Sequence, residues 1–429
     1  MPGSMSAPNT FMWPPHGCVS HERPPRDGWS TVTVDQYDDY RTALSDVTLP
    51  GAFVDLDLLE TNAATVRDRA DGTPVRVASK SVRCRAVLDR VLAFDDCFQG
   101  LMCFSGLEAA HLAAHDFDDL LVAYPLWERA ELDAVCDALV DGTDVQVMVD
   151  SAEHVDRVAS VAREHDVTVP VILDVDMSTE HLSVHFGVRR SGVRSPAAAL
   201  DVAGSIADAD GVSFAGVMGY EAQLAGLPDD DPSNNRLMNA VVRFLKRCSR
   251  PRLRERRGAV VDALRDAGHE VSLVNGGGTG TVEFTAADPS VTEVTVGSGF
   301  YSPALFDHYR RFQHEPAAGF AVAVTRRPDP DIYTCRGGGY EASGPPGVDK
   351  QPVPTYPAGA TLLDGEGAGE VQTPVQYDGP VDLSLGDPVV FRHAKAGELC
   401  ERFRDLHLVR DGAVVETVPT YRGDGRCFL

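Results

Sequence analysis

The sequence predicts an α/β protein in which a (β/α)8 TIM-type barrel is followed by a C-terminal all-β domain. From about residue 52 to residue 305, short apolar or β-branched runs alternate with stretches of helical period. Eight or nine such runs over about 250 residues match the size of one (β/α)8 barrel. After about residue 310 the apolar runs are short and broken by glycine and proline, which favours a β-domain.

We expect three segments: a partly disordered N-terminal leader over 1–47, the barrel over 48–305, and a β-domain over 306–429 that completes the active site. The arginine-rich helical stretch 234–267 is expected to present a solvated face outside the barrel. A doubly wound sheet is the alternative architecture. The predicted strands of the barrel region are 52–57, 75–79, 100–105, 119–124, 145–150, 169–174, 211–219, 271–275 and 293–296. Helices are expected at 58–70, 106–115, 126–139, 152–165 and 195–206. The predicted strands of the β-domain are 320–325, 332–335, 388–391, 406–410 and 413–418.

The composition restricts the partners and the compartment. The 64 acidic residues outnumber the 39 basic ones, and a net charge of -25 repels nucleic-acid phosphates and anionic lipid surfaces. We therefore expect a small-molecule substrate and neither a nucleic-acid nor a membrane partner. Nine cysteines in an odd, scattered set without a Cys-x-x-Cys pair indicate reduced thiols in a cytoplasmic protein. The first thirty residues contain no apolar run of the length that a signal peptide or a membrane span needs.

Lys80 directly follows the second predicted strand, so a barrel would place it on the C-terminal face, where catalytic residues gather. Lysine occurs only at positions 80, 246, 350 and 395. A solubilising role is therefore a poor explanation for Lys80, which lies among apolar residues at a strand end. Burial lowers the pKa of an amine and makes it nucleophilic, as Schiff-base chemistry requires.

A glycine run follows the eighth predicted strand, in the segment Asn275-Gly-Gly-Gly-Thr279-Gly-Thr281. Gly276, Gly277 and Gly278 let backbone N–H groups approach an anion, and Thr279 adds a hydroxyl donor. Late loops of such barrels often bind phosphate, although a flexible turn is the alternative interpretation. A Schiff-base lysine and a phosphate loop match the two anchor points of pyridoxal 5'-phosphate (PLP), a phosphorylated aldehyde.

The chain resembles the fold-type-III PLP enzymes, which have an alanine-racemase-like barrel followed by a β-domain, and within them the D-threonine aldolase and D-serine dehydratase branch. The segment Arg76-Val-Ala-Ser-Lys80-Ser-Val-Arg-Cys84 is similar to the branch's Arg-Pro-His-x-Lys-Thr-His-Lys-Cys. The resemblance implies that Lys80 carries PLP. Both histidines of the branch's segment are missing here.

The resemblance implies three further cofactor contacts. Arg190-Ser-Gly-Val193 is similar to an Arg-x-Gly-Val segment whose arginine hydrogen-bonds the pyridine nitrogen. A segment that ends at Tyr220 resembles one that places a tyrosine near the PLP phosphate. Tyr301 follows the segment that closes the barrel, where it either lines the site or packs in the core. A surface salt bridge is the alternative for Arg190.

The resemblance also points to a metal site in the β-domain, where the branch has a His-x-Cys or His-x-Asp pair. Here the stretch is Phe391-Arg-His393-Ala-Lys395, so the histidine is kept and a lysine replaces the second ligand. A divalent metal (Mn, Mg or Zn) held by His393 with Glu398 or Cys400 is one interpretation. In a second interpretation, the Lys395 ammonium takes the place of the metal. In a third, His393 is a core residue with no metal.

The resemblance implies a PLP-dependent lyase that acts on a β-hydroxy amino acid, which we expect to be the D enantiomer. The enzyme would cleave the Cα–Cβ bond to give glycine and an aldehyde. Catalysis is assigned to Lys80, His393 and Lys395, with a base near His393 taking the β-hydroxyl proton. A dehydratase of the D-serine type and an amino acid racemase are alternatives, and a homodimer is expected. Two alternatives lie outside this class. One is a non-catalytic PLP carrier, and the other is a cofactor-free Schiff-base aldolase that acts on a phosphorylated sugar.

Overall fold

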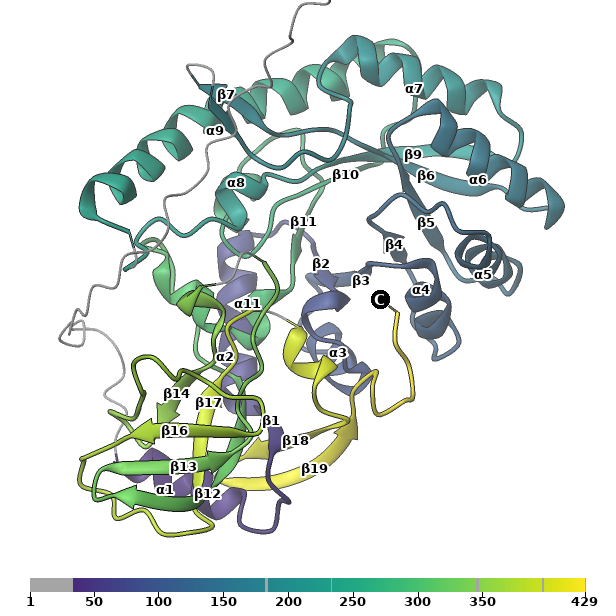
Figure 1. Ribbon diagram of the computed structural model, residues 1–429. Helices are drawn as coiled ribbons and strands as arrows, with labels where there is room; N and C mark the ends of the chain where they lie inside the picture. The colour runs from purple at the N-terminus through teal and green to yellow at the C-terminus, as the bar shows by residue number, and fades with distance from the viewer. Residues whose placement is uncertain (1–33, 182–183, 233, 345–346, 396, 429) are drawn as a thin grey trace, which may run out of the picture.

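The computed structural model describes residues 34–181, 184–232, 234–344, 347–395 and 397–428. Eight parallel strands close into a barrel in the order β10-β11-β2-β3-β4-β5-β6-β9 (Figure 1). The predicted TIM-type architecture is therefore confirmed. The barrel strands are β2 (Val75–Ala78), β3 (Phe98–Cys103), β4 (Leu120–Val122), β5 (Val145–Val149), β6 (Val169–Asp174), β9 (Val212–Gly219), β10 (Leu273–Gly276) and β11 (Glu293–Val296).

Helices follow the strands and cover the outside of the barrel. Three of them begin at a serine, Ser105, Ser151 or Ser195, whose side chain accepts a hydrogen bond from the backbone N–H three residues later. The helices are α2 (Leu56–Ala70), α3 (Arg85–Leu92), α4 (Gly106–Ala113), α5 (Arg129–Val140), α6 (Ala152–Glu164), α7 (Pro196–Asp208), α8 (Ala222–Ala225), α9 (Arg236–Asp266), α10 (Val282–Ala286) and α11 (Ser298–Tyr301).

The first predicted strand does not belong to the barrel. β1 (Gly51–Asp55) pairs antiparallel with β12 (Ala318–Asp329) and parallel with β18 (Asp405–Arg410), so it is a strand of the β-domain. An apolar run predicts a buried strand but not the sheet that buries it, because either sheet removes the same side chains from water. Lys80 consequently follows the first strand of the barrel.

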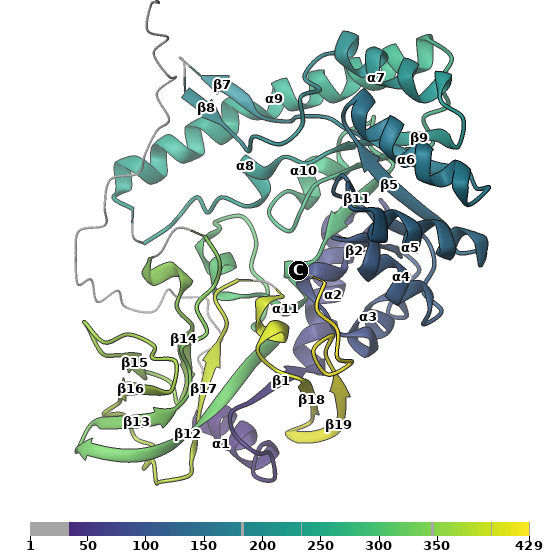
Figure 2. The ribbon, with the colours of Figure 1, turned by 45° about the vertical axis from the view of Figure 1, so that its right-hand side comes forward.

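The β-domain is a nine-stranded, mostly antiparallel sheet with the order β15-β16-β13-β12-β1-β18-β19, to which β14 and β17 are attached. All five strands predicted there are present. The remaining strands are β13 (Ile332–Arg336), β14 (Val353–Tyr356), β15 (Thr361–Leu362), β16 (Gln372–Gln376), β17 (Pro388–Arg392) and β19 (Ala413–Pro419). Figure 2 shows this domain below the barrel, with α2 where the two parts meet.

The predicted leader contains an ordered helix. Residues 1–33, and with them most of the predicted leader, lie outside the described residues. α1 (Val34–Ala43) follows and buries Tyr37 and Tyr40. The Tyr37 hydroxyl donates to the carbonyl of Pro388 at 3.0 Å, and the Tyr40 hydroxyl donates to Asp55 at 2.8 Å. The end of the leader is therefore part of the β-domain's packing.

The long helix α9 agrees with the prediction only in part. Arg247, Arg252 and Arg254 are exposed, as expected of a solvated face, but Arg257 is 1% exposed and Lys246 is buried. A hairpin of β7 (Thr179–His181) and β8 (Val184–Phe186) lies against this helix, and the Thr179 and Ser249 hydroxyls are 2.9 Å apart. Within the described part of the chain, no helix is both long and apolar enough to cross a membrane.

Candidate active site

Lys80 lies in a single turn of 3-10 helix, Ser79–Ser81, directly after β2. The turn is held in place because the Ser79 hydroxyl donates to the carbonyl of Met102 at 2.9 Å and Arg83 Nε donates to the carbonyl of Lys80 at 2.9 Å. The Lys80 Nζ donates to the Tyr124 hydroxyl oxygen at 2.6 Å. The amine therefore points across the C-terminal face of the barrel toward the end of β4.

A cavity of about 380 Å³ opens at the C-terminal ends of β4, β5, β6 and β9. This volume is within the range of small-molecule sites, and the position is the catalytic face of a TIM-type barrel. Two predicted cofactor residues, Arg190 and Tyr220, line the cavity, and so does Tyr124. Its polar lining also includes residues that the sequence analysis missed: Asp150, His154, Asp174 and Asp176.

The acidic wall of the cavity was detectable in the sequence only as polar residues at strand ends. Burial, reinforced by the negative charge of Asp150, raises the pKa of Asp174 to about 7. Asp150 is itself paired with His154, whose Nδ1 lies 2.8 Å from its carboxylate. The wall therefore contains one carboxyl that holds a proton at neutral pH more readily than an ordinary aspartate.

Arg190 and Tyr220 meet at the edge of the cavity. The Arg190 guanidinium lies 5.7 Å from the centre of the Tyr220 ring. The segment that carries Arg190 is tied to the end of β6, because the Ser191 hydroxyl donates to the carbonyl of Asp174 at 2.7 Å. Arg190 forms none of the hydrogen bonds or ion pairs found among the described residues, so it is not the surface salt bridge that was its alternative.

The glycine run forms a turn between β10 and α10, beside Tyr220. Gly277 has a φ of +84°, which disfavours a side chain, and its N–H donates to the Glu221 carboxylate at 2.9 Å. The N–H of Gly278 donates to the Thr281 hydroxyl at 3.1 Å. Among the described residues, the N–H groups of Thr279 and Gly280 have no acceptor. The N–H groups of Gly277 and Gly278 therefore already have acceptors within the protein, and those of Thr279 and Gly280 are the available donors for a bound anion.

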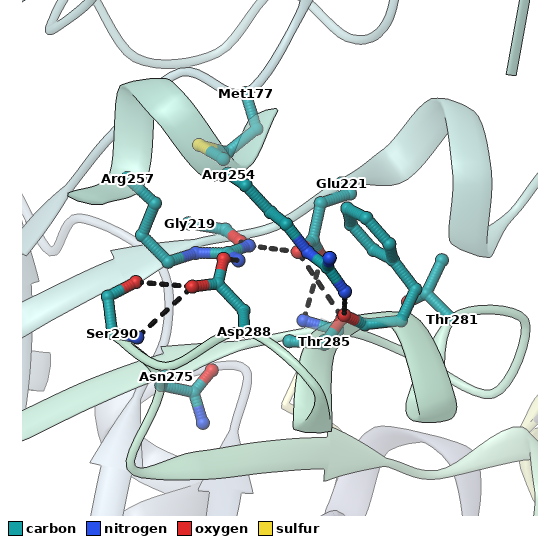
Figure 3. Close-up of polar contacts among 12 residues, drawn as sticks. Met177, Gly219, Glu221, Arg254, Arg257, Asn275, Thr281, Thr285, Asp288 and Ser290 are labelled. Carbon is teal, nitrogen blue, oxygen red and sulfur yellow. Dashed lines mark hydrogen bonds and ion pairs between the residues drawn. The ribbon is translucent and has the colours of Figure 1, made fainter. Parts of the chain in front are cut away.

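A buried ion network lies under this turn (Figure 3). Arg257 of α9 donates to Glu221 and, at 2.6 Å, to Asp288, and all three side chains are at most 3% exposed. Thr285 of α10 also donates to Glu221, at 3.3 Å. Glu221 therefore joins the glycine turn to α9 and α10, and it fixes the turn beside Tyr220.

The predicted metal residues lie in the loop after β17, on the β-domain. His393 is 4% exposed, and burial lowers its pKa to about 3. The Glu398 carboxylate accepts hydrogen bonds from Ser343 at 2.8 and 2.5 Å, and the Cys400 thiol donates to the carbonyl of Val82 at 3.2 Å. Both residues therefore have hydrogen-bond partners of their own, and the described residues contain no group of three potential metal ligands.

Lys395 and Tyr301 occupy different surroundings. Lys395 is exposed, and its Nζ donates to the Ser343 hydroxyl at 3.2 Å. Tyr301 is fully buried in α11, and its hydroxyl donates to the carbonyl of Val82 at 3.2 Å, so in this structure it packs rather than lining the cavity.

The loop after β17, which carries His393 and Lys395, reaches Lys80. A Cβ on Gly397 of this loop, whose φ is +69°, would lie 1.8 Å from the Lys80 carbonyl oxygen.

Residues 54–304 match the model of the alanine racemase N-terminal domain family. The chain belongs to this family. A D-threonine aldolase from Arthrobacter sp is 26% identical over 326 residues, covering 73% of this chain and 79% of that protein. A 3-hydroxy-D-aspartate aldolase from Paracoccus denitrificans (strain Pd 1222) is 24% identical over 255 residues, 59% of this chain and 60% of that protein.

Solved structures show the same fold. The crystal structure of D-threonine aldolase from Filomicrobium marinum matches with a TM-score of 0.75 at 22% identity, over 89% of this chain and 96% of that chain. D-threo-3-hydroxyaspartate dehydratase from Delftia sp. HT23 matches with a TM-score of 0.71 at 20% identity, over 88% and 98%. The same fold therefore occurs in an aldolase and in a dehydratase.

Proposed function

We propose that this protein is a PLP-dependent lyase that cleaves the Cα–Cβ bond of a β-hydroxy D-amino acid, giving glycine and an aldehyde. One observation carries the proposal: a lysine amine and a glycine turn border one mouth of the barrel, where Tyr124, Arg190 and Tyr220 line the cavity. Two N–H groups of that turn have no acceptor in the part of the chain that the structure describes.

The residues present fit PLP. Lys80 would hold the aldehyde carbon, and the N–H groups of Thr279 and Gly280 with the Tyr220 hydroxyl would hold the phosphate. Arg190 would donate to the pyridine nitrogen, which the guanidinium leaves unprotonated because it does not give up its proton readily. When bound, PLP supplies an electron sink for the bonds at Cα. Lys80, once released by the substrate amine, can hold and return a proton beside Cα.

The residues around His393 do not fit a bound metal, because Glu398 and Cys400 have other partners. We therefore assign no step to a metal. We propose that the Lys395 ammonium supplies the positive charge on that side, by a charge-assisted hydrogen bond.

Cleavage is favoured over dehydration for two reasons. The relatives in sequence include a D-threonine aldolase and a 3-hydroxy-D-aspartate aldolase. Expulsion of the hydroxyl as water also needs a strong electrophile, which the surroundings of His393 do not offer. The relative from Delftia is a dehydratase, so dehydration of a β-hydroxy amino acid is the second candidate. The β-domain, which reaches Lys80, argues against a PLP carrier consisting of a barrel alone.

The test is one set of incubations. PLP-loaded protein is mixed separately with D-threonine, D-serine and D-3-hydroxyaspartate, and glycine, aldehyde, keto acid and ammonia are measured together. We expect equal amounts of glycine and aldehyde from at least one substrate. Keto acid and ammonia in place of glycine would establish the dehydratase, and colourless protein that binds no PLP would favour the sugar aldolase.

Replacing Gly278 with valine is expected to weaken PLP binding at least about tenfold, which corresponds to about 1.4 kcal/mol. A Cβ at this position would lie 3.3 Å from the Tyr220 ring and 3.0 Å from Ala225, in the space between the turn and the tyrosine. The measurement is the PLP concentration that gives half-maximal visible absorbance. Gly258→Val is a matched control, because a Cβ there meets no atom within 4 Å. Equal PLP affinity in Gly278→Val and the parent would contradict a phosphate site at the turn.

Replacing Lys395 with alanine is expected to lower kcat about tenfold while PLP stays bound, because one charge-assisted hydrogen bond contributes about 1.5 kcal/mol. The parent should keep its activity after exhaustive EDTA treatment and desalting. Lys350→Ala, also in the β-domain, serves as the control. Complete loss of the parent's activity with EDTA, recovered by manganese or zinc, would show that a metal acts at His393 after all.

A further inference from the structure

Tyr124 occupies a position that the cofactor contacts described above do not explain. It is the second residue after β4, it lines the cavity, and its hydroxyl oxygen accepts the 2.6 Å hydrogen bond from Lys80 Nζ. The Lys80 Nζ also lies 5.3 Å from the centre of the Tyr124 ring. The phenol oxygen is therefore held next to the atom whose place the substrate's amine takes.

The charges around Tyr124 favour its deprotonated form. Burial alone would raise its pKa, but the nearby positive charges of Lys80 and Arg190, with the Lys80 hydrogen bond, lower it below its ordinary value. Glu108 of α4 acts in the opposite direction and raises the pKa of Tyr124. Burial, with the charge of Tyr124 as a smaller cause, raises the pKa of Tyr220, which directly follows β9. Tyr124 thus has two cations and one buried carboxyl as its charged neighbours.

We propose that Tyr124 is a catalytic acid–base residue that takes the proton from the substrate's β-hydroxyl group. This inference rests on the proposed function. In the substrate, three bonds separate the amino nitrogen from the hydroxyl oxygen, so a group in hydrogen-bond contact with the nitrogen site also reaches the hydroxyl. His393, the residue near which this base was expected, is a poorer acceptor because its buried ring resists protonation.

The proton transfers of this step balance without a further reactant. The hydroxyl proton moves to the Tyr124 oxygen, the hydroxyl carbon becomes the aldehyde carbonyl, and the electron pair of the broken Cα–Cβ bond stays on Cα. The Lys80 ammonium then gives a proton to Cα, which completes glycine. Tyr124 returns its proton to Lys80 through their hydrogen bond, and the pair is restored.

The experiment compares the parent, Tyr124→Phe and the control Tyr333→Phe, whose tyrosine lies in β13 of the β-domain. Two reactions of PLP-loaded protein are measured. One is cleavage of the β-hydroxy amino acid on which the parent is most active. The other is exchange of the glycine α-proton with D2O by NMR, which needs Lys80 but no hydroxyl group. A third measurement follows tyrosinate absorbance against pH in cofactor-free protein.

We expect Tyr124→Phe to lower kcat for cleavage by about 10²- to 10⁴-fold, the range for loss of one acid–base group. Glycine exchange should change less than about threefold, and the tyrosine that titrates at the lowest pH should disappear. Tyr333→Phe should match the parent throughout. A parallel loss of exchange and cleavage would show that Tyr124 only positions Lys80. Undiminished cleavage would overturn the proposal outright.

Failure of the proposed function gives a different pattern. If the parent exchanges glycine protons but cleaves no β-hydroxy amino acid, the reaction class is wrong and Tyr124 has no hydroxyl proton to take. If the parent cleaves and Tyr124→Phe cleaves equally well, the reaction class stands and only the assignment of Tyr124 fails.

Discussion

Replacing Lys80 with alanine should abolish both the visible absorbance of lysine-bound PLP and the cleavage reaction, with a loss of kcat on the order of 10³-fold or more. The Lys80 amine, which donates to the cavity-lining Tyr124, is the group proposed to bind the PLP aldehyde covalently and then to carry the proton to Cα. The measurements are an absorbance spectrum after PLP addition and removal of free cofactor, and the steady-state rate of glycine formation.

The other three lysines show why the effect should be specific. Lys246 is buried in α9 and donates to the carbonyl of Leu227, Lys350 pairs with Asp349, and Lys395 donates to Ser343. Unlike Lys80, none of the three is bonded in these contacts to a residue that lines the cavity. Lys350→Ala is therefore a matched control that should keep the parent's spectrum and rate. An unchanged spectrum in Lys80→Ala would overturn the assignment of the cofactor lysine.

Replacing Arg257 with methionine should destabilise the barrel by about 3–5 kcal/mol, the usual cost of removing one partner from a buried ion network. The change leaves the Glu221 and Asp288 carboxylates buried at 0% and 3% exposure without their shared cation. The free energy of unfolding is measured by urea titration of far-UV circular dichroism. PLP affinity should fall as well, because Glu221 accepts the hydrogen bond from Gly277 that fixes the glycine turn.

Arg254→Ala provides the control on the same helix. Its guanidinium lies on the exposed side, over the Phe284 ring, and donates to the Phe284 carbonyl at 3.2 Å. We expect its effect to stay within about 0.5 kcal/mol. The triple substitution Arg257→Met, Glu221→Gln and Asp288→Asn should recover part of the lost stability, because no buried charge then lacks a partner. An Arg257→Met protein as stable as the parent would show that water reaches the network.

The sequence by itself determined the alternation of strands and helices, the change to a β-domain after the barrel, and the positions of Lys80 and the glycine run at strand ends, whereas Arg190 and Tyr220 were implied by the family resemblance. These features are local: side-chain periodicity follows from the geometry of a helix or a strand, and a residue directly after a parallel strand lies on the C-terminal face. The three-dimensional structure therefore brought these residues to one mouth of the barrel, with the glycine turn beside Tyr220.

Only the tertiary structure decided which distant residues meet. β1 is as apolar as a barrel strand, yet it pairs with β12 and β18, because an apolar run records burial and not its partner. From the sequence, Arg257 was expected to be a surface charge, but in the folded chain it is buried and pairs with Glu221 and Asp288. Tyr124 and Lys80 are 44 residues apart in the chain. Their contact exists because closure of the barrel brings the ends of β2 and β4 to the same rim, which no local pattern encodes.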